Sequence, residues 1–170
     1  MFLLNKTSSY TIDMNESFCF LFPTDQLFEG FIGGFLQEIV EEKGGKAYLQ
    51  RSDMKLVDSI EIDGQEYDGA FTMRHDILVE LKGKIFILDT KYKMMTRFEG
   101  NPDEVRQNIA SESHQGDIYQ MCSYAIKRNT SEVYLLYPQF RYEDIDNSYP
   151  VANIKVADGD IKIHFVRLPF

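Results

Sequence analysis

The sequence has few of the features that identify secreted, membrane-bound or disulfide-stabilised proteins. It contains only two cysteines, Cys19 and Cys122, which are too few for a disulfide framework and favour a reducing cytoplasm. It has no run of about 18 apolar residues, the length that a membrane-spanning helix needs. Residues 1–12 lack the long apolar core of a secretory signal. We therefore expect a cytoplasmic protein that does not associate with membranes.

The sequence also lacks several motifs that would identify a function directly. There is no Cys/His cluster with zinc spacing, no glycine-rich phosphate loop, and no Ser or Cys in a nucleophile motif. We therefore expect that the chain itself binds no nucleotide. The net charge of −9 is the opposite of what a stand-alone DNA-binding protein needs. The 170 residues, 44% of them hydrophobic, are enough to bury one core, which predicts a single domain.

Two short apolar runs around Lys82-Gly83 predict a β-hairpin with acidic residues at its open end. The runs are Ile77–Leu81 and Ile85–Leu88, and the glycine supplies the positive φ that a two-residue turn needs. Such a turn places Asp76 directly across from Asp89, with Cβ atoms roughly 5 Å apart. A slip of one residue would move every side chain of a strand to the other face, so this arrangement depends on the register.

Because side chains alternate along a strand, Lys91 is expected on the same face as Asp89, and Thr90 on the other. Two carboxylates this close repel each other unless a positive group lies between them. Mg²⁺ would supply that charge, since it commonly binds carboxylates together with waters and a substrate phosphate. Lys91 would then position or deprotonate a water. The alternative is a solvated hairpin end where Lys91 forms a salt bridge; the apolar strands favour a buried site.

This segment resembles the core of the PD-(D/E)xK nucleases, and in particular the nuclease domain of McrC, the cleavage subunit of a modified-cytosine restriction system. The similar stretches are His75-Asp76-Ile77-Leu78, where His75 stands in place of the usual proline, and Leu88-Asp89-Thr90-Lys91-Tyr92-Lys93. The segment Leu27–Ile32 is similar to the helix that opens that domain. The segment Asp117–Ala125 is similar to a later helix, with the Gln-x-x-x-Tyr pattern of RecB-type nucleases. The resemblance covers about residues 20–140.

The resemblance implies a Mg²⁺-dependent DNA endonuclease, with Mn²⁺ able to substitute, that hydrolyses phosphodiester bonds. Its fold would be α/β, a PD-(D/E)xK restriction-endonuclease-like core with a mixed β-sheet flanked by helices. By the same resemblance, Asp76, Asp89 and Lys91 would be catalytic. Asp76, Asp89, the Thr90 carbonyl and Glu29 would hold the metal.

Three further residues are candidates for contacts to substrate or for support of the site. Gln120 and Tyr124 lie one helical turn apart, and the resemblance places both near the metal, contacting the DNA backbone or holding Lys91. The alternative is a surface amide and a packing tyrosine. His114 precedes the second predicted helix, in a loop where it could touch substrate.

Glu29, the candidate metal ligand from the first helix, projects at the edge of an apolar helical stripe. The alternative is that Glu29 is a solvated helix residue.

The resemblance also implies partners. These are DNA and a McrB-like GTPase ring with its own DNA-reading module, and a homodimer is an option for double-strand cleavage. The chain is short for a whole McrC protein, which carries an additional N-terminal region that engages the ring. A different class of function remains open: a catalytically silent nuclease-fold interaction module in a defence complex. The acidic charge favours this alternative, whereas the presence of Asp76, Asp89 and Lys91 together argues against it.

Local patterns predict the surrounding elements of one domain, with a core at about 20–140 and a C-terminal hairpin at about 150–168. Residues 1–22 are expected to be irregular or to contain a short β segment. The predicted helices are one from Pro23-Thr24-Asp25, capped by Thr24 or Asp25, to Lys43-Gly44-Gly45; a short one from Pro102; and one over 117–128. The predicted strands are 47–49, 66–73 after an Asp63-Gly64 turn, 132–137 ended by Pro138, and 151–156 with 161–166 around Asp158-Gly159.

Overall fold

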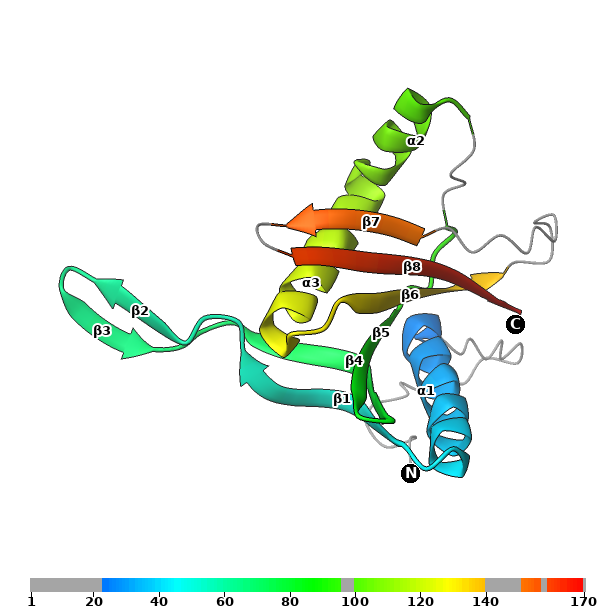
Figure 1. Ribbon diagram of the computed structural model, residues 1–170, viewed down its shortest axis with the longest axis horizontal. Helices are drawn as coiled ribbons and strands as arrows, with labels where there is room; N and C mark the ends of the chain where they lie inside the picture. Colours follow the sequence, from blue (N-terminus) through cyan, green and yellow to red (C-terminus); the bar gives the residue numbers. More distant parts are fainter. Residues whose placement is uncertain (1–22, 96–99, 140–150, 157–158, 170) are drawn as a thin grey trace, which may run out of the picture.

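A six-stranded mixed sheet of order β1-β4-β5-β6-β8-β7 forms the centre of the protein (Figure 1). The computed structural model describes residues 23–95, 100–139, 151–156 and 159–169. The helices in these ranges are α1 (Thr24–Glu42), α2 (Pro102–Ile109) and α3 (Glu112–Arg128). The strands of the large sheet are β1 (Lys46–Lys55), β4 (Thr72–Leu81), β5 (Lys84–Thr90), β6 (Glu132–Gln139), β7 (Val151–Val156) and β8 (Gly159–Pro169), and a separate pair is β2 (Ser59–Ile62) with β3 (Gln65–Asp68).

The β4–β5 hairpin has the predicted turn and register. Ile77 pairs with Leu88 at the open end, and Leu81 pairs with Lys84 beside the turn. Lys82 and Gly83 both have positive φ, 52° and 74°, as a primed hairpin turn requires. On its other side β5 runs parallel to β6. The end of β5 therefore lies between two strands, which places its last residues deep in the sheet.

Two hydrophobic clusters cover the two faces of the sheet. The α1 side chains Phe28 and Ile32 pack in one cluster, and the α3 side chains Met121 and Ala125 pack in the other. Ile87 belongs to the α3 cluster, while its neighbour Leu88 packs against the α1 cluster. Since successive strand residues point to opposite faces, the two helices lie on opposite faces of β5. The α/β architecture with a mixed sheet flanked by helices agrees with the prediction.

Several predicted boundaries were wrong. The N-cap of α1 is Pro23, with no side-chain cap, so neither Thr24 nor Asp25 caps the helix. The second long helix begins at Glu112 rather than at 117. Strand β6 continues through Pro138. At this position β6 is paired with β8 but no longer with β5. A proline is tolerated here because one side of the strand needs no ladder hydrogen bond. The expectations for residues 1–22 and for the turn at Asp158 lie outside the described residues.

The predicted strand at 66–73 is divided between β3 and β4 because the chain bends at Gly69. A Cβ at Gly69 would lie 2.1 Å from the carbonyl oxygen of Val57, so only glycine permits this close approach of the two backbones. Beyond the bend, β2 and β3 form a hairpin arm, with the predicted turn at Asp63-Gly64, that projects from the rest of the molecule (Figure 1). Ion pairs from Lys127 to Asp58 and from Arg128 to Asp53 connect its base to α3.

No helix in the described parts of the chain is long and apolar enough to cross a membrane.

The two faces of α1 give a direct test of the packing. Phe28 is fully buried against the sheet, whereas Phe35 is 56% exposed although it belongs to the same apolar stripe of the sequence. We expect Phe28→Ala to lower the free energy of unfolding by about 3–5 kcal/mol, because it removes a buried ring and leaves a cavity. The matched change Phe35→Ala should cost less than about 1 kcal/mol. Urea denaturation of both variants measures this difference, and equal losses would contradict the packing.

Candidate active site

Asp76 and Asp89 come from adjacent antiparallel strands, next to the last hairpin pair, Ile77 with Leu88. Asp89 is only 1% exposed, while Asp76 is half-buried. The Asp76 carboxylate accepts hydrogen bonds from the backbone N–H and the side-chain hydroxyl of Thr90, both at 2.9 Å. Thr90, predicted on the face opposite Asp89 and Lys91, is thus hydrogen-bonded to Asp76. At the open end of the hairpin, the Asp76 side chain extends across to β5. Its Oδ2 atom accepts both hydrogen bonds from Thr90.

The Lys91 ammonium lies against Asp89, with Nζ 2.5 Å from Oδ2. Nζ also donates to Oε1 of Gln120 at 3.1 Å and lies 3.5 Å from Oδ1 of Asp117. The Lys91 backbone N–H donates to the carbonyl of Leu136 on β6 at 2.8 Å. Lys91 thus forms a salt bridge, as the alternative of a solvated hairpin end predicted. The bridge is not solvated, however, because the Lys91 side chain is only 19% exposed.

A chain of hydrogen bonds from α3 holds Lys91 and continues to the backbone of β4. Nε2 of Gln120 donates to the Tyr124 hydroxyl at 2.9 Å, and that hydroxyl donates to the carbonyl of Arg74 at 2.7 Å. Tyr124 is buried and its ring lies 4.5 Å from the ring of His75. Of the roles considered for Gln120 and Tyr124, the geometry corresponds to holding Lys91.

Glu29 of α1 lies within electrostatic reach of Asp76. Nε2 of Gln50 donates to its Oε1 at 3.2 Å. Burial raises the pKa of Glu29, and the negative charge of Asp76 raises it further. Glu29 is therefore half-buried within electrostatic reach of Asp76 rather than a freely solvated helix residue.

The charges around Asp89 are only partly balanced. Burial, and then the neighbouring Asp76, raise the pKa of Asp89 to about 6, although the Lys91 ammonium acts in the opposite direction. Burial by itself lowers the pKa of Lys91, but Asp89, Asp117 and Asp76 outweigh it and the pKa is raised. Lys91 is thus fully protonated at neutral pH, and negative charge is in excess at this point.

The structure does not place His114 where the sequence suggested. It lies within α3 rather than in a preceding loop, and its ring is 1% exposed. The ring packs edge-on against Tyr137 and Phe165, at centroid distances of 6.2 and 6.3 Å. The earlier start of α3 explains the difference, because it turns this position onto the buried face of the helix. The ring is therefore enclosed by the protein rather than placed in a loop.

Two residues of the site were missed in the sequence. Asp117 contacts both Lys91 and Lys93, the latter at 2.6 Å. Helical spacing could have identified it, since it lies one turn before Gln120 on the same side of α3. Gln50 had no signal in the sequence, because its contact with Glu29 depends on an unusual backbone conformation within β1.

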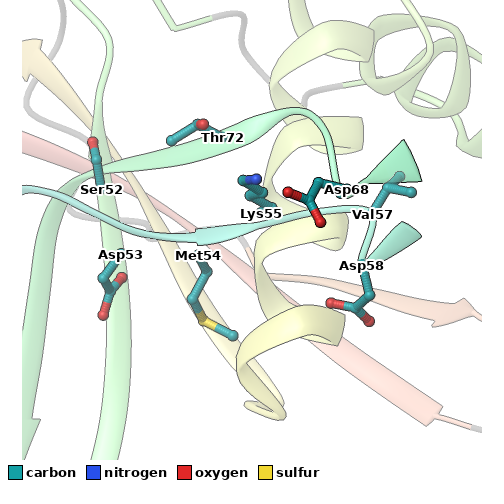
Figure 2. Close-up of a pocket in the computed structure, with 9 residues that line it drawn as sticks. Ser52, Asp53, Met54, Lys55, Val57, Asp58, Asp68 and Thr72 are labelled. Atoms are coloured by element: carbon teal, nitrogen blue, oxygen red, sulfur yellow. The ribbon is translucent and has the colours of Figure 1, made fainter. Parts of the chain in front are cut away.

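A separate pocket lies at the base of the hairpin arm. This pocket of about 580 Å³ includes Asp53, Asp58 and Asp68, which Figure 2 shows on three different segments, but none of the predicted site residues. Two of the three acids are already paired with basic residues of α3. In the part of the chain that the structure describes, no three His, Cys, Asp or Glu side chains are gathered closely enough to hold one metal ion.

Comparisons with known proteins identify a family and a similar fold. The family model for "McrBC 5-methylcytosine restriction system component" matches residues 1–138. A chain in the refined half-complex from a tetradecameric assembly of Thermococcus gammatolerans McrB AAA+ hexamers with bound McrC has a similar structure, with a TM-score of 0.52 and 12% sequence identity. The match covers 86% of this chain and 28% of that chain, so the present chain spans less than a third of its length. No curated protein sequence matches.

The raised pKa of Asp89 predicts a specific dependence of stability on pH. Between its ordinary value of 3.8 and about 6, the folded protein retains a proton that the unfolded chain has lost. Ionisation of Asp89 therefore reduces stability as the pH rises through this window, and the full cost remains above it. With a chelator present, we expect Asp89→Asn to be more stable than wild type at pH 8, by about 1–3 kcal/mol, and nearly equal to it at pH 4. Urea denaturation at both pH values measures this; a difference that does not change with pH would contradict it.

Proposed function

Because the chain belongs to the McrBC 5-methylcytosine restriction system component family, we propose that it is a Mg²⁺-dependent DNA endonuclease of the McrC type, with a PD-(D/E)xK restriction-endonuclease-like core. The observation that supports this most strongly is the position of Asp76 and Asp89 on adjacent strands, with the Lys91 ammonium against Asp89. A hairpin end without a catalytic role has no need to bury an acid whose ionisation costs stability. Such perturbed, partly compensated groups are typical of functional sites.

The residues present are chemically suited to a hard divalent cation. The candidate ligands are the carboxylates of Asp76, Asp89 and Glu29 and the carbonyl of Thr90, all of them oxygen donors of the kind that Mg²⁺ and Mn²⁺ prefer. Burial, and then the charge of Asp76, raise the pKa of Asp89, and a cation would stabilise its ionised form. Since these carboxylates are not yet gathered around one point, we expect cation binding to draw them together and to release Asp89 from Lys91.

The groups of this chain divide the catalytic work. Asp76, Asp89 and Glu29 would hold a Mg²⁺ ion, which would supply activation of water and neutralisation of charge on the phosphate. Lys91 orients the attacking water and donates a hydrogen bond to the developing charge. Its raised pKa favours this donor role over that of a general base, because the amine stays protonated. Gln120 and Tyr124 fix the ammonium in place through their hydrogen bonds to it and to β4.

The proposed partners follow from charge and from the family. A protein with a net charge of −9 has weak affinity for DNA by itself, so a second subunit must hold the substrate. A McrB-like GTPase ring is the natural partner, since the similar structure contains McrB hexamers with bound McrC. This chain would supply the nuclease site and the ring would supply nucleotide hydrolysis. Two copies acting on opposite strands would produce a double-strand break.

The competing proposal is a catalytically silent module that keeps this fold as a scaffold in a defence complex. It is favoured by the acidic charge and by the described acids not being gathered around one point. The two proposals differ in what Asp89 and Lys91 do, so substitutions at these positions separate them.

Metal binding is the first test. We expect Mn²⁺ or Mg²⁺ to raise the melting temperature, because a ligand that binds only the folded state stabilises it by mass action. Asp89→Asn should remove most of this increase, since it replaces a charged ligand in the centre of the site. Differential scanning fluorimetry with increasing MnCl₂ measures the effect. An equal response of wild type and Asp89→Asn would show that the cation binds elsewhere.

Cleavage is the second test. Lys91→Ala leaves every proposed metal ligand in place, so it should retain the metal-induced stabilisation while losing about 100-fold or more of the rate of DNA cleavage. The control is Lys84→Ala, an exposed lysine at the opposite end of the same hairpin, which should cleave at the wild-type rate. The assay contains a McrB-like partner, GTP and methylated DNA. If wild type recruits the partner but does not cleave, and the substitutions change nothing, the scaffold proposal is correct.

A further inference from the structure

Gln50 has a left-handed backbone conformation inside the edge strand β1, just before the irregularity in pairing between Arg51 and Met54. Its φ is 50°, in the left-handed region, which costs a residue with a side chain roughly 1 kcal/mol or more. The other described non-glycine residues with positive φ lie outside the interiors of strands; Asp63 and Lys82 occupy hairpin turns, and Asn129 ends α3. Gln50 instead lies well inside β1. Strain that persists in the interior of an element is typical of functional sites.

The strained residue is directly across from the proposed active site. Leu49 pairs with Ile77 and Arg51 pairs with His75, so Gln50 occupies the position opposite Asp76. Its side chain extends to α1, where Nε2 donates a hydrogen bond to Oε1 of Glu29 at 3.2 Å. Gln50 thus connects the first helix to β1, the strand that pairs with the strand carrying Asp76.

The hydrogen bond from Gln50 would hold the carboxylate in place if Glu29 is a metal ligand. Glu29 is on the flank of a helix, and its side chain has three rotatable bonds that would carry the carboxylate away from the repelling charge of Asp76. A hydrogen bond from a neutral amide stabilises the ionised carboxylate without adding a competing positive charge. The left-handed conformation of Gln50 sends its amide toward Glu29, in a direction that regular strand geometry does not provide.

We propose that Gln50 is a positioning residue whose strained conformation holds the Glu29 carboxylate beside Asp76, so that Glu29 completes the divalent-cation site. This inference rests on the proposed metal-dependent function. Gln50 does not touch the cation; it acts only through Glu29. The affinity for the cation should therefore depend on Gln50 when Glu29 is intact, and should not depend on it when Glu29 cannot bind.

The test is a double-mutant cycle on the full chain, with MnCl₂ binding measured by isothermal titration calorimetry. Gln50→Gly permits the same backbone conformation but removes the amide, and we expect Mn²⁺ affinity to fall about tenfold, the scale of a hydrogen bond to a charged group. In a Glu29→Gln background the same change should cause no further loss, because coupled residues are not additive. Lys82→Gly is the matched control, since it has the same φ class in a turn far from the acids and should bind Mn²⁺ as wild type does.

The outcomes separate this inference from the function on which it rests. If wild type binds no Mn²⁺ at the acids, both are overturned. If wild type binds Mn²⁺ but Gln50→Gly has the wild-type affinity, or loses affinity equally in both backgrounds, only the role of Gln50 is overturned. Gln50→Asn provides a second variant should the glycine variant fold poorly. Asparagine tolerates the left-handed region, and its shorter side chain should also lose the contact with Glu29.

Discussion

The register of the β4–β5 hairpin is the constraint on which the rest of the site depends. Lys82 and Gly83 form a tight turn with positive φ at both residues, and this turn determines which residues of the two strands face each other. A shift by one residue would move Asp89 and Lys91 to the face covered by α1, away from Gln120 and Asp117 of α3. The parallel pairing of β5 with β6 adds a second restraint, because it also fixes the end of β5.

The site that this register creates also depends on a balance of buried charges around Asp89. Asp89 is almost completely enclosed, and its carboxylate is compensated by the Lys91 ammonium, which it shares with Asp117. The compensation is incomplete, as the raised pKa of Asp89 indicates. Buried polar groups of this kind are costly unless their hydrogen bonds are made, which explains why the Lys91 ammonium also donates to a side chain of α3. The same imbalance supports the proposed cation.

The sequence predicted best where the chain determines its own geometry locally. The turn at Lys82-Gly83, the strands on either side and the helix after Pro23 follow from glycine placement and from apolar spacing, and all are present. Position in the fold was harder to predict. Phe35 has the periodicity of a core residue, yet no described element covers it, and His114 appeared exposed because the start of α3 was placed too late. Gln50 could not be found at all, since a left-handed residue inside a strand depends on contacts between β1, β4 and α1 rather than on local preference.

The two neighbours of β5 are reached through very different lengths of chain, and this has a consequence for the order of folding. Strand β4 is joined to β5 by a two-residue turn, whereas β6 follows only after α2 and α3. Contacts close in sequence form within microseconds, and distant parallel pairings form much later. Asp76 and Asp89 therefore meet in the early hairpin, before Leu136 and Gln120 can fix Lys91. Lys91 lacks these partners until the second half of the chain arrives, so α3 and β6 complete the site as well as pack against the hairpin.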